Sequence, residues 1–236
     1  AFRYCKAMTT FTVDPNNQHY EAENGVLFTM NKIKLIQYPL NKEDKKYTLP
    51  ESTTEIEKYA FYGNEKLHYI TFNEQLTTIN EYSFGKMNDI RTITLPKSIK
   101  TIQPNSFNGC EKLRIVMIKE EVTITCSAAS AFEGTASNLE IYVKNSNAIT
   151  TLCEKNVNKY IEQAKIGDFI HYVVATDKKM VMYGMEAMNA VTKGNQPWID
   201  QKENIETVII DEDITTLEAY SFTEMTSLKQ VTLPTS

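Results

Sequence analysis

The sequence predicts an α+β repeat solenoid, built from irregular Leu- and Ile-rich repeats of about 23 residues with β-hairpin inserts and a helical cap. Segments 47–69, 70–92 and 93–115 align without gaps, which sets the period at 23 residues. The stretches that interrupt this period show alternating apolar residues in two places and a helix-like spacing in one. Such self-similarity is typical of coils that stack on their neighbours.

Each repeat is expected to form one coil of the solenoid. The stretch Ile93-Thr94-Leu95 alternates as a strand with one buried face does, and Pro96 then ends the strand. Apolar residues farther along, such as Phe107, are spaced to line the far side of the coil. A single coil cannot bury these side chains, but stacked coils can.

Further copies lie outside this block. A fourth copy starts at Val116 and carries an insertion, because Phe132 follows Phe107 by 25 residues. A fifth copy spans 208–230 and is followed by the start of a sixth. Residues 2–13 also match part of a repeat. Since both ends cut through a repeat, we expect the chain to be a piece of a longer array.

Two segments predict β-hairpins. Within residues 14–46, apolar stretches at 26–28 and 33–38 flank a polar pair. The same arrangement recurs on either side of residues 177–179. Trp198 follows just before the repeats resume, and we expect it to be buried in a cap that opens a second stack.

A third segment, residues 145–165, carries apolar residues at helical spacing and predicts a capping helix. Ser146 is its expected N-cap and Gly167 its expected stop. The patterns together predict two domains. Residues 1–166 form a first stack with the hairpin insert and the capping helix, and residues 167–236 form a hairpin cap and the truncated start of a second stack.

Composition excludes two classes of partner. The net charge is −5, and Lys and Arg are scattered among Asp and Glu rather than clustered on one segment. Nucleic acid is therefore not an expected partner. No apolar run is long enough to span a bilayer, so we expect no membrane insertion within this segment.

The four cysteines are expected to be buried free thiols. Cys5 and Cys110 fall at equivalent places in two repeats, which suits small side chains buried in a stack. None of the four, Cys126 and Cys153 included, forms a Cys-x-x-Cys pair or lies at metal-ligand spacing from a histidine. A disulfide is the alternative that the sequence leaves open.

The repeat resembles the pattern of the BspA-like leucine-rich-repeat family. In this sequence, the positions that define the family's pattern are occupied by Leu113, Val116, Ile93, Pro96, Ile99, Ile102, Phe107 and Cys110. The hairpin stretch from Val13 to Pro39 is similar to an insert that recurs in the family. Thr53 and Asn64 depart from the pattern, which has an aliphatic residue and a Cys there, so we expect looser packing in that coil.

The resemblance implies irregular leucine-rich repeats and, more loosely, a surface or secreted protein that adheres to host proteins and cells. It implies no shared catalytic residues. The chain itself carries no phosphate-binding or nucleophile motif, and His19, His68 and His171 lie far apart in the repeat pattern. We therefore expect no catalytic residue, no metal site and no cofactor, and we do not expect an enzyme.

The predicted partner-binding surface is the strand face of the solenoid. It consists of side chains that point away from the core within each strand: Tyr69, Thr71, Thr92, Thr94, Ile115, Met117 and Tyr142. Tyr, Met and Ile on an exposed sheet suit protein recognition. The alternative is that Thr only favours strand formation and that the predicted helix covers the apolar end.

The sequence thus predicts a non-catalytic module that binds a protein partner, such as a host or matrix protein or an assembly partner. Adhesion at the cell surface or in secreted form is the first hypothesis. An intracellular, cytoplasmic scaffold or assembly protein with the same fold is the alternative, and it predicts free thiols. Fold alone does not decide between them.

Overall fold

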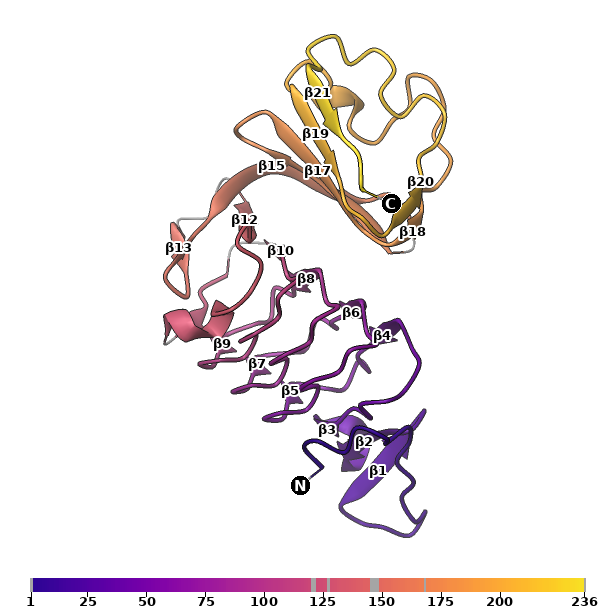
Figure 1. The fold of residues 1–236 in the computed structure, drawn as a ribbon, viewed down its shortest axis with the longest axis vertical. Helices are drawn as coiled ribbons and strands as arrows, with labels where there is room; N and C mark the ends of the chain where they lie inside the picture. Colours follow the sequence, from indigo (N-terminus) through magenta and orange to yellow (C-terminus); the bar gives the residue numbers. More distant parts are fainter. Residues whose placement is uncertain (1, 120–121, 127, 145–148, 168, 236) are drawn as a thin grey trace. The chain divides into compact units, whose positions relative to one another are not determined.

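The computed structural model describes residues 2–119, 122–126, 128–144, 149–167 and 169–235. Within these ranges it contains β-strands and three short 3₁₀ segments but no α-helix (Figure 1). The repeat solenoid is therefore confirmed, whereas the α+β class and the helical cap are wrong. The reason lies in residues 149–165, which are described below.

The chain divides into two compact units. The first contains Ala1–Val143 and Asn147–Val157, and the second contains Lys144–Ser146 and Asn158–Ser236. Each unit has a hydrophobic core of its own. The two predicted domains, 1–166 and 167–236, stay a prediction.

The coils of the first unit contribute two sets of strands, and the strands within each set pair in parallel (Figure 1). The first strand is the predicted alternating stretch, and the second is a two-residue strand that the sequence patterns do not predict. The first strands pair as β4–β6 and as β8–β10–β12. They are β4 (Lys46–Thr48), β6 (Tyr69–Thr71), β8 (Thr92–Leu95), β10 (Ile115–Ile118) and β12 (Glu140–Lys144). The second strands pair in order as β5 (Glu55–Ile56), β7 (Thr78–Ile79), β9 (Thr101–Ile102) and β11 (Thr125–Cys126).

A column of aromatic rings explains why the period is strict. Phe61, Phe84, Phe107 and Phe132 stack with centroids 5.1–5.2 Å apart and interplanar angles of at most 12°. Phe132 ends the short segment η2 (Ala129–Phe132). The N–H of each of the first three donates to the carbonyl just before the next Phe, at 2.8–2.9 Å. Tyr38 begins the column, 5.2 Å from Phe61.

The two departures from the family pattern are buried and hydrogen-bonded. The Thr53 hydroxyl donates to the carbonyl of Lys32 at 2.7 Å. The Asn64 side-chain oxygen accepts the N–H of Leu67 at 2.8 Å. Both residues are fully buried, so the expectation of looser packing in this coil is wrong. Local polar partners replace the apolar contact that the pattern would supply.

The hairpin predicted within residues 14–46 is confirmed. Its strands, β2 (Val26–Thr29) and β3 (Lys34–Gln37), pair antiparallel around η1 (Met30–Lys32). Asn31 and Lys32 have φ values of 60° and 52°, the positive values that a tight hairpin turn requires. An unpredicted strand, β1 (Tyr20–Glu23), pairs antiparallel with β2. Because β3 pairs in parallel with β5, this insert begins the sheet of second strands.

The described part of the predicted helix forms strands instead. It consists of the hairpin β13 (Thr151–Leu152) and β14 (Lys155–Asn156), followed by the strand β15 (Asn158–Lys165). Cys153 and Glu154, at the hairpin turn, have φ values of 47° and 64°, which a right-handed helix excludes. Ser146 lies outside the described residues, and Gly167 ends no helix. The β-branched residues that recur through the segment favour strands.

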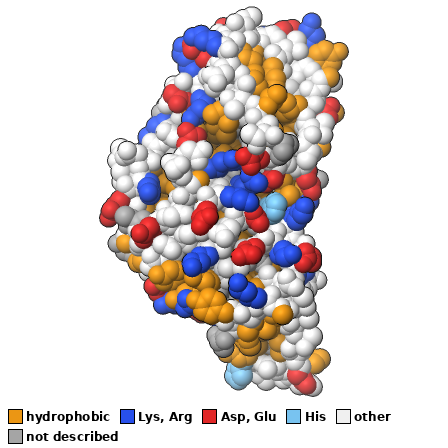
Figure 2. Space-filling view, viewed as in Figure 1, with side chains coloured by type: hydrophobic (Ala, Val, Ile, Leu, Met, Phe, Trp, Pro, Cys, Tyr) orange, Lys and Arg blue, Asp and Glu red, His pale blue; other side chains and the backbone are white. Residues whose placement is uncertain are grey.

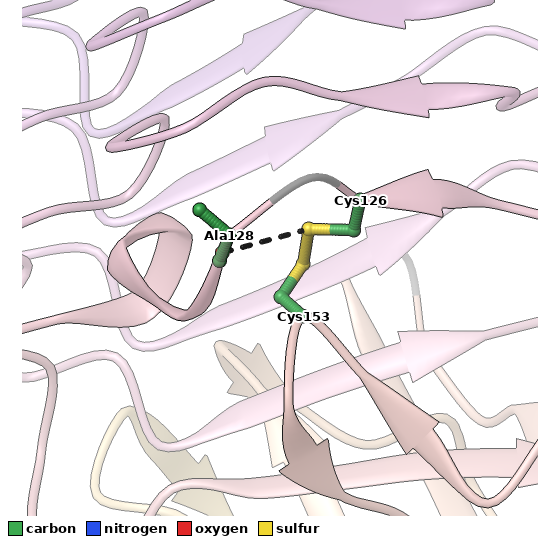
Figure 3. The surroundings of a disulfide bond; sticks show 3 residues. All are labelled: Cys126, Ala128 and Cys153. Carbon is green, nitrogen blue, oxygen red and sulfur yellow. Dashed lines mark hydrogen bonds between the residues drawn. A yellow bond between two sulfur atoms is a disulfide. The ribbon is translucent and has the colours of Figure 1, made fainter.

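Cys126 and Cys153 form a disulfide (Figure 3), so the free thiols expected at these two positions are wrong. Their Cα atoms are 5.1 Å apart, within the range that a disulfide spans. The bond ties the β13–β14 hairpin to β11, and Leu152 and Cys153 join the core of the first unit. Sequence spacing alone does not reveal such a pairing.

The other two cysteines are free. Cys110 is buried as predicted, and burial raises the pKa of its thiol to about 12. Cys5 is exposed, so its expected burial is wrong.

The second unit opens with the other predicted hairpin, which is confirmed by the antiparallel pairing of β16 with β17. β15 pairs antiparallel with β16, and β17, β19 and β21 pair in parallel. Its elements after β15 are β16 (Ile170–Ala175), β17 (Lys179–Gly184), β18 (Glu186–Ala187), η3 (Ile199–Gln201), β19 (Thr207–Ile210), β20 (Ile214–Thr216) and β21 (Gln230–Thr232).

Trp198 is buried in the core of this second unit, as predicted. Its indole N–H donates to the carbonyl of Ser221 at 3.1 Å, and its ring stacks on Phe222 at 6.5 Å. In the first unit, the Tyr38 ring stacks on Phe61 at 5.2 Å, and the backbone N–H of Tyr38 donates to the carbonyl of Ala60 at 2.9 Å. In each unit, a large aromatic residue begins the column of rings that the repeats continue.

Candidate functional site

Strand pairing places residues of the predicted strand face side by side on neighbouring strands. Thr92 pairs with Ile115, and Thr94 pairs with Met117, whose other neighbour is Tyr142. Tyr69 and Thr71 lie on β6, in an earlier coil. The described core cluster of the first unit includes none of these side chains, so they lie on the side of the strands that faces away from the core.

Most of this face is closed to solvent, however. Thr71 is exposed and Thr94 is half-buried. The other five are at most 6% exposed: Tyr69, Thr92, Ile115, Met117 and Tyr142. Met117, for example, lies between the side chains of Thr94 and Tyr142 on the same face, and such cross-strand neighbours cover one another. The expected exposed stripe is therefore wrong at these five positions, and partner binding by the strand face stays a prediction.

An open pocket of about 680 Å³ lies elsewhere in the first unit, at its N-terminal strands. Leu27 of β2 and Ile36 of β3 line it. They alternate with Phe28 and Leu35, which enter the core, so the pocket is on the outer side of this sheet. The N-terminal segment adds Phe2 and Phe11, whose rings meet edge to face at 4.9 Å, and Tyr20 comes from β1.

Charged side chains also line the pocket, and most of them are already engaged. Glu57 is 3.3 Å from the ammonium of Lys34, and Lys58 pairs with Glu81. Asp14 accepts the N–H of Asn16 at 2.8 Å within a turn. Arg3 also lines the pocket, and among the described residues it pairs with no carboxylate.

Four tyrosines adjoin the pocket around Arg3. Tyr59 and Tyr82 stack at 5.2 Å with an interplanar angle of 7°, and Tyr62 meets both edge-on at 5.5 and 6.1 Å. Tyr4 meets Tyr62 at 6.0 Å. The Arg3 guanidinium lies 4.2 Å from the Tyr59 ring centre and 4.7 and 4.9 Å from those of Tyr4 and Tyr62. We call these five residues the tyrosine cluster; Figure 2 shows hydrophobic side chains gathered beside Lys and Arg on this face of the molecule.

Three of these tyrosines have a left-handed backbone. Tyr4, Tyr59 and Tyr82 have φ values of 71°, 64° and 55°. Asn105 occupies the place of Tyr59 and Tyr82 in the next coil, and Gly109 occupies the place of Tyr4 relative to the repeat's Phe. Asn and Gly adopt this conformation readily, whereas other residues incur about 1–2 kcal/mol. A bulky residue with a strained backbone conformation points to a function of its side chain.

A glycine makes room for the centre of the cluster. A Cβ atom at Gly85 would lie 2.8 and 2.9 Å from two ring carbons of Tyr62. Because real Cβ atoms do not approach other atoms so closely, Tyr62 could not keep its place beside any larger residue at that position. The glycine at position 85 therefore leaves the space that the Tyr62 ring occupies in the cluster.

In the part of the chain that the structure describes, no three side chains of His, Cys, Asp or Glu gather closely enough to hold a metal ion. No helix among the described residues has the length and hydropathy needed to cross a bilayer. What the tyrosine cluster and the pocket can do is present aromatic, hydroxyl and guanidinium groups to a ligand.

The sequence patterns do not predict this site, although one signal for it exists. Tyr59 and Tyr82 occupy the same column of adjacent repeats, so their stacking follows from the period. The approach of Arg3 and Tyr4 to these coils depends on how the N-terminal segment folds back. No local pattern encodes that contact.

Comparison with known proteins identifies the repeat. The model of the BspA type leucine-rich repeat region matches six copies over residues 40–159 and 194–236, which is more than half of the chain. No curated protein matches the sequence.

Two solved structures with TM-scores of 0.54 and 0.50 share the fold. The pneumococcal vaccine antigen PcpA is 18% identical over 95% of this chain and 50% of its own, with a TM-score of 0.54. A leucine-rich repeat protein from Eubacterium ventriosum ATCC 27560 is 21% identical over 98% of this chain and 50% of its own, with a TM-score of 0.50. A leucine rich cell surface protein from Faecalibacterium prausnitzii A2-165 is 25% identical over 59% of this chain and 42% of its own, with a TM-score of 0.48. The chain thus spans half or less of the length of these structures.

Proposed function

Because the chain belongs to the BspA-type leucine-rich repeat family, we propose that it is a non-catalytic module that binds a protein partner, and that it acts in adhesion at the cell surface or in secreted form. The family's repeats supply a rigid scaffold, and the site on that scaffold has to supply the function.

The observation that carries this proposal is the tyrosine cluster beside an open, apolar-lined pocket. Tyr and Arg are the residues that most often dominate the binding energy of protein interfaces. Tyr4 is 61% exposed, while Tyr59 and Tyr82 are fixed by stacking on each other. Rigid aromatic side chains lose little conformational entropy when a partner binds.

The disulfide supports a location outside the cytosol. Disulfides persist in oxidising surroundings and are rare where glutathione keeps thiols reduced. Cys126–Cys153 closes the end of the first stack, where Cys153 is 5% exposed and belongs to the core. A bond built into the core in this way suits a secreted or surface protein.

The alternative is an intracellular scaffold, and the two free cysteines favour it. Cys5 is exposed and Cys110 is buried, and neither is paired.

Labelling of intact producing cells with a membrane-impermeant amine-reactive biotin distinguishes the surface location from the intracellular scaffold. Recovery of the chain in the biotinylated fraction supports the surface location, and recovery only after the cells are broken supports the scaffold.

The tyrosine cluster is the primary surface in this proposal, and the strand face is secondary. Of the predicted strand-face residues, only Thr71 is fully open, with Thr94 half-buried. A binding energy of several kcal/mol requires side chains that a partner can reach and desolvate.

Adhesion is tested with beads that carry the chain. We expect such beads to be retained on immobilised extracellular-matrix proteins or on cultured epithelial cells more than beads that carry an unrelated acidic protein. Substitution of Tyr59→Asn and Tyr82→Asn together should abolish most of the retention, because Asn keeps the backbone of Asn105 and removes the rings. Equal retention of both kinds of bead would contradict the proposal.

A further inference from the structure

We propose that the N-terminal pocket binds a peptide segment of the protein partner in which a carboxylate side chain stands next to a large apolar side chain, and that Arg3 holds this carboxylate. The inference rests on the proposed function and specifies the chemistry of the partner. Neither the family match nor the solved structures assign a ligand to this pocket.

The lining of the pocket fits the apolar part of such a segment. Phe2, Phe11, Leu27 and Ile36 present aromatic and aliphatic surface outside the hydrophobic core. Apolar side chains gathered away from the core, with polar groups around them, are characteristic of ligand sites. At about 680 Å³, the pocket has room for one large side chain and some of its flanking backbone.

Arg3 is the group of the lining that can take a carboxylate. Lys58, the other cation of the lining, pairs with Glu81, and Lys34 lies between two carboxylates, 2.9 Å from Glu55 and 3.3 Å from Glu57. Asp14 caps a turn through the N–H of Asn16. Within the described residues, this leaves the Arg3 guanidinium as the cation without a carboxylate partner.

Arg3 retains hydrogen-bonding capacity for a ligand. A guanidinium has five N–H donors. Arg3 donates to the Tyr4 hydroxyl at 2.6 Å. The other donors of the guanidinium exceed the two that its bidentate geometry with a carboxylate requires. The three rings at 4.2–4.9 Å hold the group in place before the ligand arrives.

The geometry favours a peptide over a glycan. Sugars bind aromatic side chains by lying against an open ring face. The Tyr82 ring stacks on Tyr59, and the Arg3 guanidinium lies over the same ring. Tyr59, the tyrosine of the cluster that lines the pocket, therefore offers little open ring face. The guanidinium and the phenol hydroxyls are groups suited to an acidic side chain and a peptide backbone.

The test uses the whole chain and a hexapeptide labelled at its N-terminus, fluorescein-GSEFSG-amide, titrated by fluorescence polarisation at low salt. Matched peptides replace the acidic residue with Gln or the aromatic residue with Ala. We expect a Kd below about 1 mM for the first peptide, in the range of weak single-site contacts. The Gln replacement should weaken binding about tenfold or more, because it removes the charge-assisted hydrogen bonds to Arg3. The Ala replacement should weaken binding about tenfold or more, because it removes the apolar side chain that the pocket buries.

Variants of the chain locate the binding. Arg3→Ala should weaken the acidic peptide about tenfold and leave the Gln peptide unchanged, because only the carboxylate loses a partner. Tyr220→Asn, at the corresponding place in the second unit, is the control and should change nothing. Equal affinity for the acidic and Gln peptides, no binding at all, or full binding by Arg3→Ala would each overturn the inference. If beads still adhere through Tyr59 and Tyr82 while the peptides fail, only this inference fails; if adhesion fails as well, the proposed function fails with it.

Discussion

Ser83 and Ser106 stand directly before the stacked phenylalanines, where neighbouring coils have Ala60 and Ala131. Both serines are fully buried, and neither hydroxyl has a hydrogen-bond partner among the described residues. A buried polar group without a partner destabilises the folded state by about 1–3 kcal/mol. The repeat itself thus indicates that Ala is the better residue at these two places.

We therefore predict that Ser106→Ala raises the free energy of unfolding of the first unit by about 1 kcal/mol. The control is Ser221→Ala in the second unit, because the Ser221 hydroxyl donates to the carbonyl of Glu218 at 2.6 Å and would lose that bond. Urea midpoints at an unchanged slope measure both changes. A loss of stability in Ser106→Ala would show that an unseen partner satisfies this hydroxyl.

Tyr82 illustrates a balance of two effects at one residue. Its left-handed backbone, with φ of 55°, is strained by about 1 kcal/mol. Its ring gains about 0.5–1.5 kcal/mol from stacking on Tyr59. The backbone strain thus offsets much of the stacking energy, and the ring stabilises the fold less than it would on a relaxed backbone.

The prediction is that Tyr82→Asn leaves the free energy of unfolding within about 1 kcal/mol of the original, while Tyr82→Ala lowers it further. Asn relieves the backbone strain and Ala does not, although both remove the ring. Thermal unfolding of the two variants side by side provides the comparison. If Asn proves as destabilising as Ala, the backbone at this position is not strained in the way we describe.

Among the elements, the β13–β14 hairpin depends on a covalent bond. Each of its strands has only two residues, and an isolated pair of that length is unstable in water. The Cys126–Cys153 disulfide, across 27 residues, holds it against the last coil. Removal of such a bond costs about 2–4 kcal/mol.

Counting thiols tests this element. Without reductant, the folded chain should show one reactive thiol, Cys5, because the pKa of Cys110 is raised to about 12 by burial and its thiolate is scarce below that pH. Unfolding without reductant should expose two thiols, and reduction should expose all four. Four reactive thiols in the unfolded, non-reduced chain would mean that the disulfide is absent.

The sequence predicts the coils of this fold well and its ends poorly. Phe61, Phe84 and Phe107 repeat because stacked rings must stay in register, so periodicity reveals them directly. The segment at 145–165 has helical spacing, but its turn at Cys153 is fixed by the disulfide to a residue 27 positions earlier. Local spacing cannot encode that constraint. The same limit applies to the functional site, because Arg3 reaches the tyrosines only through the folded-back N-terminal segment.

The strand face fails as a predicted site for a related reason. The alternation of apolar residues along the strand correctly predicts that the Met117 side chain points away from the core. It does not predict whether a side chain that points outward is exposed to solvent. Met117 lies between Thr94 and Tyr142 and is fully buried. Direction follows from local sequence, whereas exposure depends on everything that packs nearby.

At the scale of the whole molecule, the repeats supply stability and leave the surface free to vary. Ion pairs such as Lys66–Glu43 at 2.9 Å connect successive coils, but exposed pairs contribute little. The cores of the two units carry most of the stability, each beginning with a large aromatic residue, Tyr38 or Trp198. A surface cluster can therefore change without cost to the fold, which is what a binding module requires.

The central claim is that partner binding occurs at the tyrosine cluster and its pocket. It is tested most directly by the hydrogen–deuterium exchange footprint of the chain bound to the matrix or cell-surface protein that retains it. We predict that protection concentrates in residues 2–14, 57–62 and 80–86, with little change in β8, β10 and β12. Protection of those three strands instead, or of the second unit alone, would contradict the account and restore the strand face as the binding surface.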